Sequence, residues 1–174
     1  MPAPKLIVFS GLPGVGKTTL SRELAQQLGA TYIRIDSVET ALKVSSLKID
    51  PAEEAGYLAS AAIAMDNLKN GLTVIADAVN PVNEARQLWS DAARNSGAAL
   101  INVEITCTDR SEHQQRVESR VADLDGLQQP GWQIIQKRRF EPWSGDVQRL
   151  DTAGRNVQDC VAELLNIVAA QDPG

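Results

Sequence analysis

The sequence has few of the residues that build metal clusters and disulfide frameworks. Its 174 residues include two cysteines, Cys107 and Cys160, and one histidine, His113. The cysteines form no CxxC pair, and one histidine cannot complete a His/Cys zinc site. We therefore expect no transition-metal cluster and two reduced cysteines that serve in packing. His113 is expected on an exposed helix, without a catalytic role.

Long apolar runs and an excess of basic charge are also missing. The apolar runs are far shorter than the roughly 20 residues that span a bilayer, and no basic segment with an apolar signal core opens the chain. Seventeen Lys and Arg residues stand against 22 Asp and Glu, for a net charge of −5. This balance does not favour a broad grip on a nucleic-acid backbone. We expect a cytoplasmic protein without a membrane partner.

The first chemical signal is a glycine-rich loop between an apolar run and a periodic helix. Gly11, four residues and then Gly16-Lys17-Thr18 have the spacing of a phosphate-binding P-loop. Glycines let successive N–H groups turn around a polyphosphate, and the N-terminus of the following helix adds positive potential. The predicted nucleotide contacts are Gly11, Leu12, Pro13, Gly14, Val15, Gly16, Lys17, Thr18 and Thr19.

Two side chains of this loop have specific expected roles. Lys17 is predicted to reach the β and γ phosphates of ATP, and the Thr18 hydroxyl is predicted to be a ligand of Mg²⁺. ATP and Mg²⁺ are thus the expected cofactors.

Apolar strands alternate with helical patterns along the whole chain. The predicted strands cover 6–9, 31–35, 72–76, 100–105 and 147–150. Alternation of this kind implies right-handed crossovers and a parallel sheet covered on both faces. The predicted fold is α/β, a three-layer α/β/α sandwich with a five-stranded parallel sheet, and residues 1–174 are expected to form one domain. An alanine-rich helix is predicted over 51–70, with Glu53 and Glu54 in its first turn.

Polar residues follow several of the predicted strands, at the edge where such sheets bind ligands. Asp36 follows the second strand, where it can accept the proton of an attacking hydroxyl or, beside Ser37, merely cap a helix. Asp77 follows the third strand as a second predicted ligand of Mg²⁺ beside Thr18, or as a turn aspartate. Asn80 orients a ligand or belongs to the same turn.

Residues 110–140 are predicted to form a helical lid, because the break over 125–131 interrupts two helical segments, the second reaching Phe140. Arg116 and Arg120 are four residues apart and share a helix face, so they can close over phosphates.

The alternative is a solvated face, on which Glu112 and Arg116 form an ordinary surface ion pair. The basic run Lys137-Arg138-Arg139 is also expected to be solvated.

Taken in order, these features resemble the small P-loop kinases of the AAA-type ATP-binding group. Within that group the chain is most similar to the 5′-polynucleotide kinase domain, the zeta-toxin kinases and chloramphenicol phosphotransferase. The resemblance implies a general base at Asp36, catalytic roles for Lys17, Arg116 and Arg120, and an adenine site near Thr152 and Arg155.

Two classes of function follow. The first is a kinase that phosphorylates a hydroxyl of a small metabolite or antibiotic, or the 5′-hydroxyl of a polynucleotide, which the net charge does not favour. The second is a non-catalytic, nucleotide-dependent binding module or an ATPase. Asp77 is followed by Ala78, not by the catalytic glutamate of motor ATPases, so the kinase is the preferred interpretation.

Overall fold

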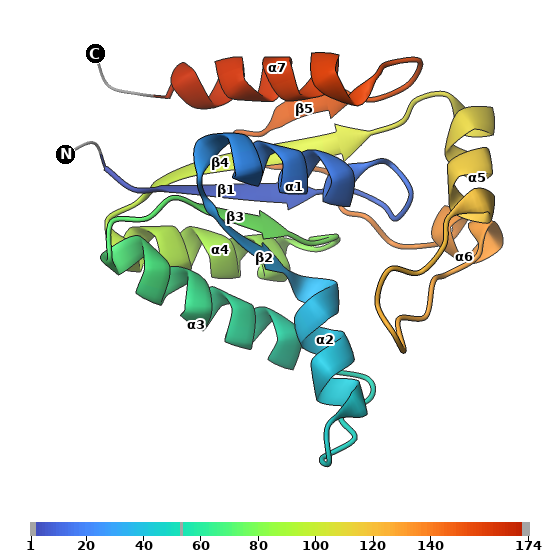
Figure 1. The fold of residues 1–174 in the computed structure, drawn as a ribbon, viewed down its shortest axis with the longest axis horizontal. Coiled ribbons are helices and arrows are strands. Elements are labelled where there is room, and N and C mark those ends of the chain that lie inside the picture. Colours follow the sequence, from blue (N-terminus) through green and yellow to red (C-terminus); the bar gives the residue numbers. More distant parts are fainter. Residues whose placement is uncertain (1–2, 53, 172–174) are drawn as a thin grey trace.

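The computed structural model describes residues 3–52 and 54–171. Five strands and seven helices alternate along these ranges (Figure 1). The strands are β1 (Lys5–Ser10), β2 (Thr31–Arg34), β3 (Val74–Asp77), β4 (Ala99–Thr106) and β5 (Gln148–Asp151). The helices are α1 (Lys17–Leu28), α2 (Ile35–Val44), α3 (Ala55–Lys69), α4 (Asn83–Ser96), α5 (Arg110–Ser119), α6 (Trp132–Gln136) and α7 (Val157–Ala169).

The five strands form one parallel sheet in the order β2-β3-β1-β4-β5. Helices α1 and α7 cover one face, and α3 and α4 cover the other (Figure 1). The predicted three-layer α/β/α sandwich with a five-stranded parallel sheet is therefore confirmed. Because all strands run the same way, their carboxyl ends share one edge, where Phe9 of β1 lies beside Asp77 of β3.

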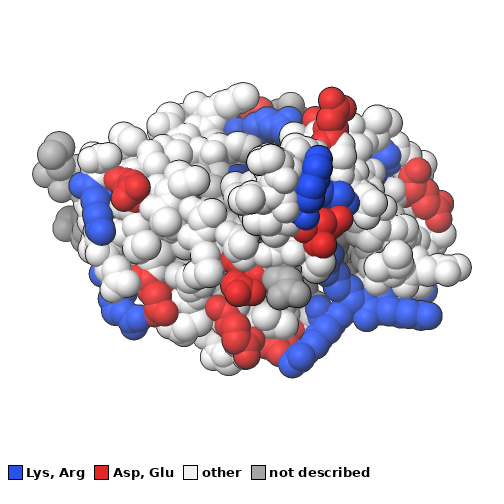
Figure 2. Space-filling model, turned by 90° about the horizontal axis from the view of Figure 1, so that it is seen from below, with Lys and Arg blue, Asp and Glu red and all other residues white. Residues whose placement is uncertain are grey.

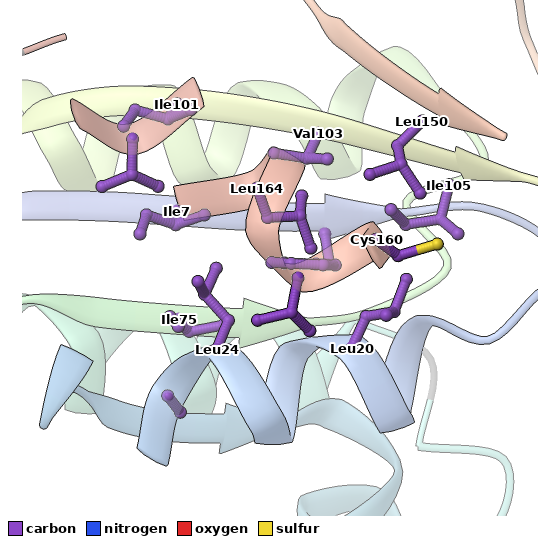
Figure 3. Packing of buried hydrophobic residues seen from close by; sticks show 14 of the residues in the cluster. Ile7, Leu20, Leu24, Ile75, Ile101, Val103, Ile105, Leu150, Cys160 and Leu164 are labelled. Atoms are coloured by element: carbon purple, nitrogen blue, oxygen red, sulfur yellow. The ribbon is translucent and has the colours of Figure 1, made fainter. Parts of the chain in front are cut away.

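Each face of the sheet has its own apolar core. On the α1 and α7 side, Leu20 and Leu24 pack with Leu164 over the inward residues of the strands, as Figure 3 shows. On the other side, the fully buried Trp89 of α4 packs with small residues of α3. Cys107 and Cys160 are buried and unpaired, as predicted. The P-loop thus stands between a strand and a helix that are both fixed by packing.

Helix α2 begins earlier, and α3 later, than the sequence pattern suggests. Strand β2 ends at Arg34, which is itself the N-cap of α2, so Asp36 lies in the first helical turn and Ser37 is not a cap. Helix α3 starts at Ala55 instead of Pro51, because the preceding residues form a turn in which the Ala55 amide donates to the Ala52 carbonyl. The prediction for Glu54 in the first turn was therefore wrong, and Glu53 lies outside the described residues.

The second helical segment of the expected lid is also shorter than predicted. Helix α6 ends at Gln136 and does not reach Phe140. Arg86 holds the chain further on, because its guanidinium donates to the carbonyls of Glu141 and Pro142 and lies over the Phe140 and Trp143 rings. These contacts hold the chain after α6 away from a helical path. In the described ranges, no helix is both long enough and apolar enough to cross a bilayer.

Candidate functional site

A large cleft of about 1200 Å³ follows the carboxyl edge of the sheet. One end, named the P-loop end here, is lined by Gly16, Lys17, Thr18, Arg116, Thr152 and Asn156. The other, the α2 end, is lined by Asp36, Glu39, Pro51, Tyr57 and Pro81. Figure 2 views the molecule from the side of α2 and shows acidic and basic side chains next to one another on this face. The cleft therefore joins the phosphate-binding motif to the residue predicted as a base.

The P-loop requires glycine at defined positions. Gly11, Gly14 and Gly16 all have positive φ, a backbone region that other residues rarely adopt. A Cβ on Gly11 would lie 2.3 Å from the carbonyl oxygen of Ile105, and one on Gly14 would lie 2.5 Å from a methyl of Val117. The loop thus passes too close to β4 and α5 for a side chain.

The nine residues predicted to bind phosphate divide into two groups. Pro13, Gly14, Gly16, Lys17, Thr18 and Thr19 line the cleft. Gly11, Leu12 and Val15 do not line it, and the Val15 side chain belongs to the core that Leu12 also packs against. Any contact of these three residues with a nucleotide has to come from their backbone amides.

Lys17 is the first residue of α1 and is almost completely buried. Its Nζ donates to the Leu12 carbonyl at 3.0 Å. Burial lowers the pKa of this ammonium group, although the negative charges of Asp77 and Asp36 act in the opposite direction. Because the buried Lys17 ammonium group has the Leu12 carbonyl as its hydrogen-bond partner, it can exchange this carbonyl for a phosphate oxygen.

Thr18 and Asp77 lie side by side beneath the P-loop. The Thr18 hydroxyl donates to Asp77 Oδ2 at 2.7 Å, and the Tyr32 hydroxyl donates to the same oxygen at 2.9 Å. Burial, together with the Asp77 charge, raises the pKa of Tyr32, so this phenol stays a donor. Tyr32 was not foreseen, and it orients the carboxylate that the sequence predicted as a metal ligand.

Asp36 lines the α2 end of the cleft beside an arginine that the sequence analysis missed. Arg34 Nη2 lies 3.4 Å from Asp36 Oδ2, and Arg34 Nη1 donates to Asp123 Oδ2 at 2.7 Å. The Arg34 side chain is only 8% exposed, whereas that of Asp36 is 44% exposed. Asp36 makes no capping bond to α2, so the helix-cap interpretation is wrong. The available signal was an arginine two residues before Asp36, at the end of a strand.

Arg116 projects from α5 across the mouth of the P-loop end. Its guanidinium donates to the Thr152 hydroxyl at 2.8 Å and to the Thr152 carbonyl at 3.0 Å, and it pairs with Glu112. The Thr152 hydroxyl in turn donates to the Val15 carbonyl at 2.9 Å. The predicted Glu112–Arg116 ion pair exists, but it belongs to a network that joins α5, β5 and the P-loop.

Arg120 and Arg155 also line the cleft, with different partners. Arg120 follows the end of α5 and donates to the Pro130 carbonyl at 3.0 Å, which closes the loop between α5 and α6. Arg155 pairs with Glu163 of α7 at 2.8 Å. Arg116 and Arg120 therefore contact different segments and do not act as one pair in this structure.

His113 is buried, so the prediction of an exposed histidine was wrong. Its Nε2 lies 2.9 Å from the Pro13 carbonyl, and its ring meets the edge of Trp132 with the ring centres 5.0 Å apart. The many polar residues of α5 suggested a solvated helix, but the face of α5 that carries His113 packs on the P-loop. His113 thus supports the loop from behind, through α5 and α6.

Asn80 is a structural residue of the loop after β3. It is completely buried, its amide nitrogen donates to the Phe9 carbonyl at 3.0 Å, and its side-chain oxygen accepts from Trp89 Nε1 at 2.9 Å. Its backbone carbonyl accepts from Arg86 at 3.0 Å. With both side-chain groups bonded inside the protein, Asn80 does not orient a ligand.

Comparison with solved structures shows the same fold in two named kinases and in Kti12. A gluconokinase from Sinorhizobium meliloti aligns with a TM-score of 0.68 and 18% identity over 98% of this chain and 94% of its own. The APS kinase CysC of Mycobacterium tuberculosis, solved with AMPPNP and APS, gives 0.71 and 16% over 97% and 99%. Kti12 of Chaetomium thermophilum, solved with ADP-AlF3, gives 0.62 and 20% over 94% and 98%. At these identities the likeness establishes the P-loop kinase-like fold.

A search of curated proteins gives no match. A family model described as "AAA domain" matches residues 6–142, from the first strand through the segment after α6. This match covers most of the chain and includes the P-loop, Asp36, Asp77 and the expected lid. The chain therefore belongs to this AAA domain family.

Proposed function

We propose that this chain is an ATP-dependent kinase that transfers the γ-phosphoryl group to a hydroxyl of a small acceptor. The observation that supports this most directly is the continuity of the cleft from the P-loop to Asp36. Its volume of about 1200 Å³ exceeds the roughly 300–1,000 Å³ of an ordinary ligand pocket, so a nucleotide and a second substrate have room together.

The P-loop end is the proposed nucleotide site. Lys17 leaves the Leu12 carbonyl and binds the β and γ phosphates, while the loop amides contact the remaining phosphate oxygens. Thr152 and Arg155 border the adenine, and Arg116 spans the mouth beside Thr152. The APS kinase CysC, which has the same fold, has been solved with AMPPNP, and this supports ATP as the nucleotide.

Thr18 and Asp77 fit a magnesium ion. Both present oxygen to the P-loop end, and among the described residues no group of three or more His, Cys, Asp or Glu side chains forms a metal site elsewhere. Mg²⁺ typically uses one or two protein oxygens and completes its shell with phosphate and water. Bound there, it would neutralise phosphate charge.

Asp36 is the proposed general base. The acceptor hydroxyl enters from the α2 end, and its oxygen forms a bond to the γ phosphorus as its proton passes to Asp36. The bond from the γ phosphorus to the bridging oxygen breaks, and ADP leaves. Arg34, whose Nη2 lies 3.4 Å from Asp36 Oδ2, orients this carboxylate.

Residues 110–140 are proposed to act as a lid, with Arg116 and Arg120 contacting the phosphates after closure. Such closure excludes water from the reacting group. The break between α5 and α6 supports this reading, since residues 120–131 contain no regular element.

The acceptor is proposed to be small, such as a metabolite or an antibiotic. A 5′-hydroxyl polynucleotide kinase is the alternative, and it is less favoured because the chain carries a net charge of −5. A non-catalytic binding module remains the alternative of another class. It is less favoured because it gives no functional role to Asp36, which lies at the α2 end of the cleft.

The first experiment tests the P-loop. We expect Lys17→Ala to abolish ATP·Mg²⁺ binding in calorimetric titration and product formation in an acceptor screen detected by mass. Lys69→Ala, which removes an exposed lysine of α3, is the control and should match the parent. Unchanged affinity and turnover in Lys17→Ala would contradict the proposed function.

A further inference from the structure

Arg138 differs from its two basic neighbours. It lines the cleft, whereas Lys137 and Arg139 do not, and Arg139 instead pairs with Glu141. Within the described residues, the Arg138 guanidinium has no hydrogen bond or ion pair, although its backbone amide donates to the Ile135 carbonyl at 3.1 Å. All three residues are exposed, as expected, but the middle one also lines the cleft. Arg138 is therefore an exposed cation that lines the cleft and whose guanidinium has no partner among the described residues.

The charge of Arg138 acts on groups at both ends of the cleft. It adds to the burial that lowers the pKa of Lys17 in the P-loop. Burial and the charge of Asp36 raise the pKa of Glu39 on α2, and Arg138 opposes that rise. Arg138 thus lines the same cleft as Lys17 of the P-loop end and Glu39 of the α2 end.

The backbone that carries Arg138 is braced against the P-loop. Arg138 follows α6, whose Ile135 is buried and whose Trp132 ring packs on His113. His113 contacts the Pro13 carbonyl at 2.9 Å. A chain of packed contacts therefore joins the base of the Arg138 side chain to the phosphate-binding loop in this structure.

The other arginines of the cleft already have partners. Arg116 holds Thr152 and Glu112, Arg34 holds Asp36 and Asp123, and Arg120 holds the Pro130 carbonyl. Recruiting any of them to a phosphate breaks a bond that the structure shows. Arg138 needs no such exchange, because its donors have no protein partner among the described residues.

We propose that Arg138 is a further catalytic residue, whose guanidinium contacts the phosphoryl group during transfer. The proposal rests on the proposed kinase function. Negative charge spreads over the three non-bridging oxygens of the phosphoryl group as it moves, and a planar guanidinium with five donors matches two of these oxygens at once. The contact is stronger in the transition state than with bound ATP, so it accelerates transfer without tightening ATP binding.

Arg138→Ala tests this, with Arg139→Ala as the matched control one residue away. We expect Arg138→Ala to lower the rate of ATP turnover about 10²–10³-fold, the usual effect of losing one transition-state donor, while its ATP dissociation constant stays within about threefold of the parent. Arg139→Ala should keep the parental rate. Added guanidinium ion at millimolar concentration should restore part of the rate in Arg138→Ala and none in the control.

A second measurement uses ADP and Mg²⁺ with aluminium fluoride, which imitates the phosphoryl group in transfer. The parent should bind ADP more tightly when aluminium fluoride is present, and Arg138→Ala should lose most of this gain but bind ADP alone normally. Turnover within a few-fold of the parent in Arg138→Ala, or equal loss in both variants, overturns the assignment. Because ATP binding is measured in the same variants, a parent that binds no ATP would instead reject the kinase proposal itself.

Discussion

Asp36→Asn separates catalysis from stability more cleanly than other substitutions in the cleft. Asparagine keeps the size of the side chain and removes its charge and its capacity to take a proton. The structural cost is small. The Asp36 side chain is 44% exposed in its 3.4 Å contact with Arg34, and pairs with a solvent-exposed partner contribute about 0–1 kcal/mol. An acid in the first turn of a helix adds about 0.3–1 kcal/mol, so the free energy of unfolding should fall by no more than about 1–2 kcal/mol.

The kinetic effect should be larger. Loss of general-base assistance typically lowers a rate about 10²–10⁴-fold, which corresponds to roughly 3–5 kcal/mol in the activation free energy. ATP affinity should hardly change, because Asp36 lies on α2 whereas the predicted phosphate contacts lie on the P-loop and α1.

The assay is turnover with an identified acceptor, or acceptor-free ATP hydrolysis, together with ATP calorimetry and thermal unfolding on the same samples. Asp66→Asn is the control, because this exposed acid of α3 does not line the cleft. If Asp36→Asn turns over within a few-fold of the parent, Asp36 is not the base, and the binding-module alternative gains weight.

Two further predictions concern the support of the site. Asn80→Ala should lower the free energy of unfolding by about 2–4 kcal/mol in urea titration, because buried groups including Trp89 Nε1 lose their partner; a loss below 1 kcal/mol would contradict this. Hydrogen bonds from Arg34 and Arg22 lower the pKa of Asp123, so these bonds should be complete above its unfolded pKa near 4 and disappear as the pH falls through the lower folded value. Protection factors for hydrogen exchange over 120–130 should then fall in acid, and Asp123→Asn should show the lower protection already at neutral pH; equal protection in both proteins would count against the contact.

The P-loop and the succession of strands and helices along the chain could be predicted because both are local patterns, whereas the order within the sheet, in which β3 lies between β2 and β1, could not. The glycine spacing lies within Gly11 to Thr18, and the apolar run of β1 and the leucines of α1 adjoin it directly. Strands β1 and β3 were recognisable from short apolar segments, whereas β5 has little apolar character, and parallel topology followed from the alternation with helices. Asp77 could be foreseen for the same reason, since it ends a completely buried strand.

Residues whose role depends on distant contacts could not be read in this way. His113 stands in a polar helix, and only the packing of α5 on Pro13 makes it a buried support. Arg138 looks like part of a solvated run, and only the end of α6 at Gln136 turns it towards the cleft. Arg34 is close to Asp36 in the sequence, but its burial depends on Asp123, 89 residues further along the chain.

The two ends of the cleft are built from different kinds of segment, so substitutions at the two ends should have different effects. The P-loop end comes mainly from one continuous motif, and the need to bind ATP determines which residues that motif contains. The α2 end is assembled from α2, the turn before α3, the loop after β3 and the segment after α6. No sequence motif with a fixed spacing links these segments. Their residues can therefore change to suit a different acceptor without altering the sheet. Proteins that are only 16% to 20% identical to this chain have the same fold. Substitutions at Glu39 or Tyr57 should therefore change the choice of acceptor and leave ATP binding intact, whereas substitutions in the P-loop should remove ATP binding for every acceptor.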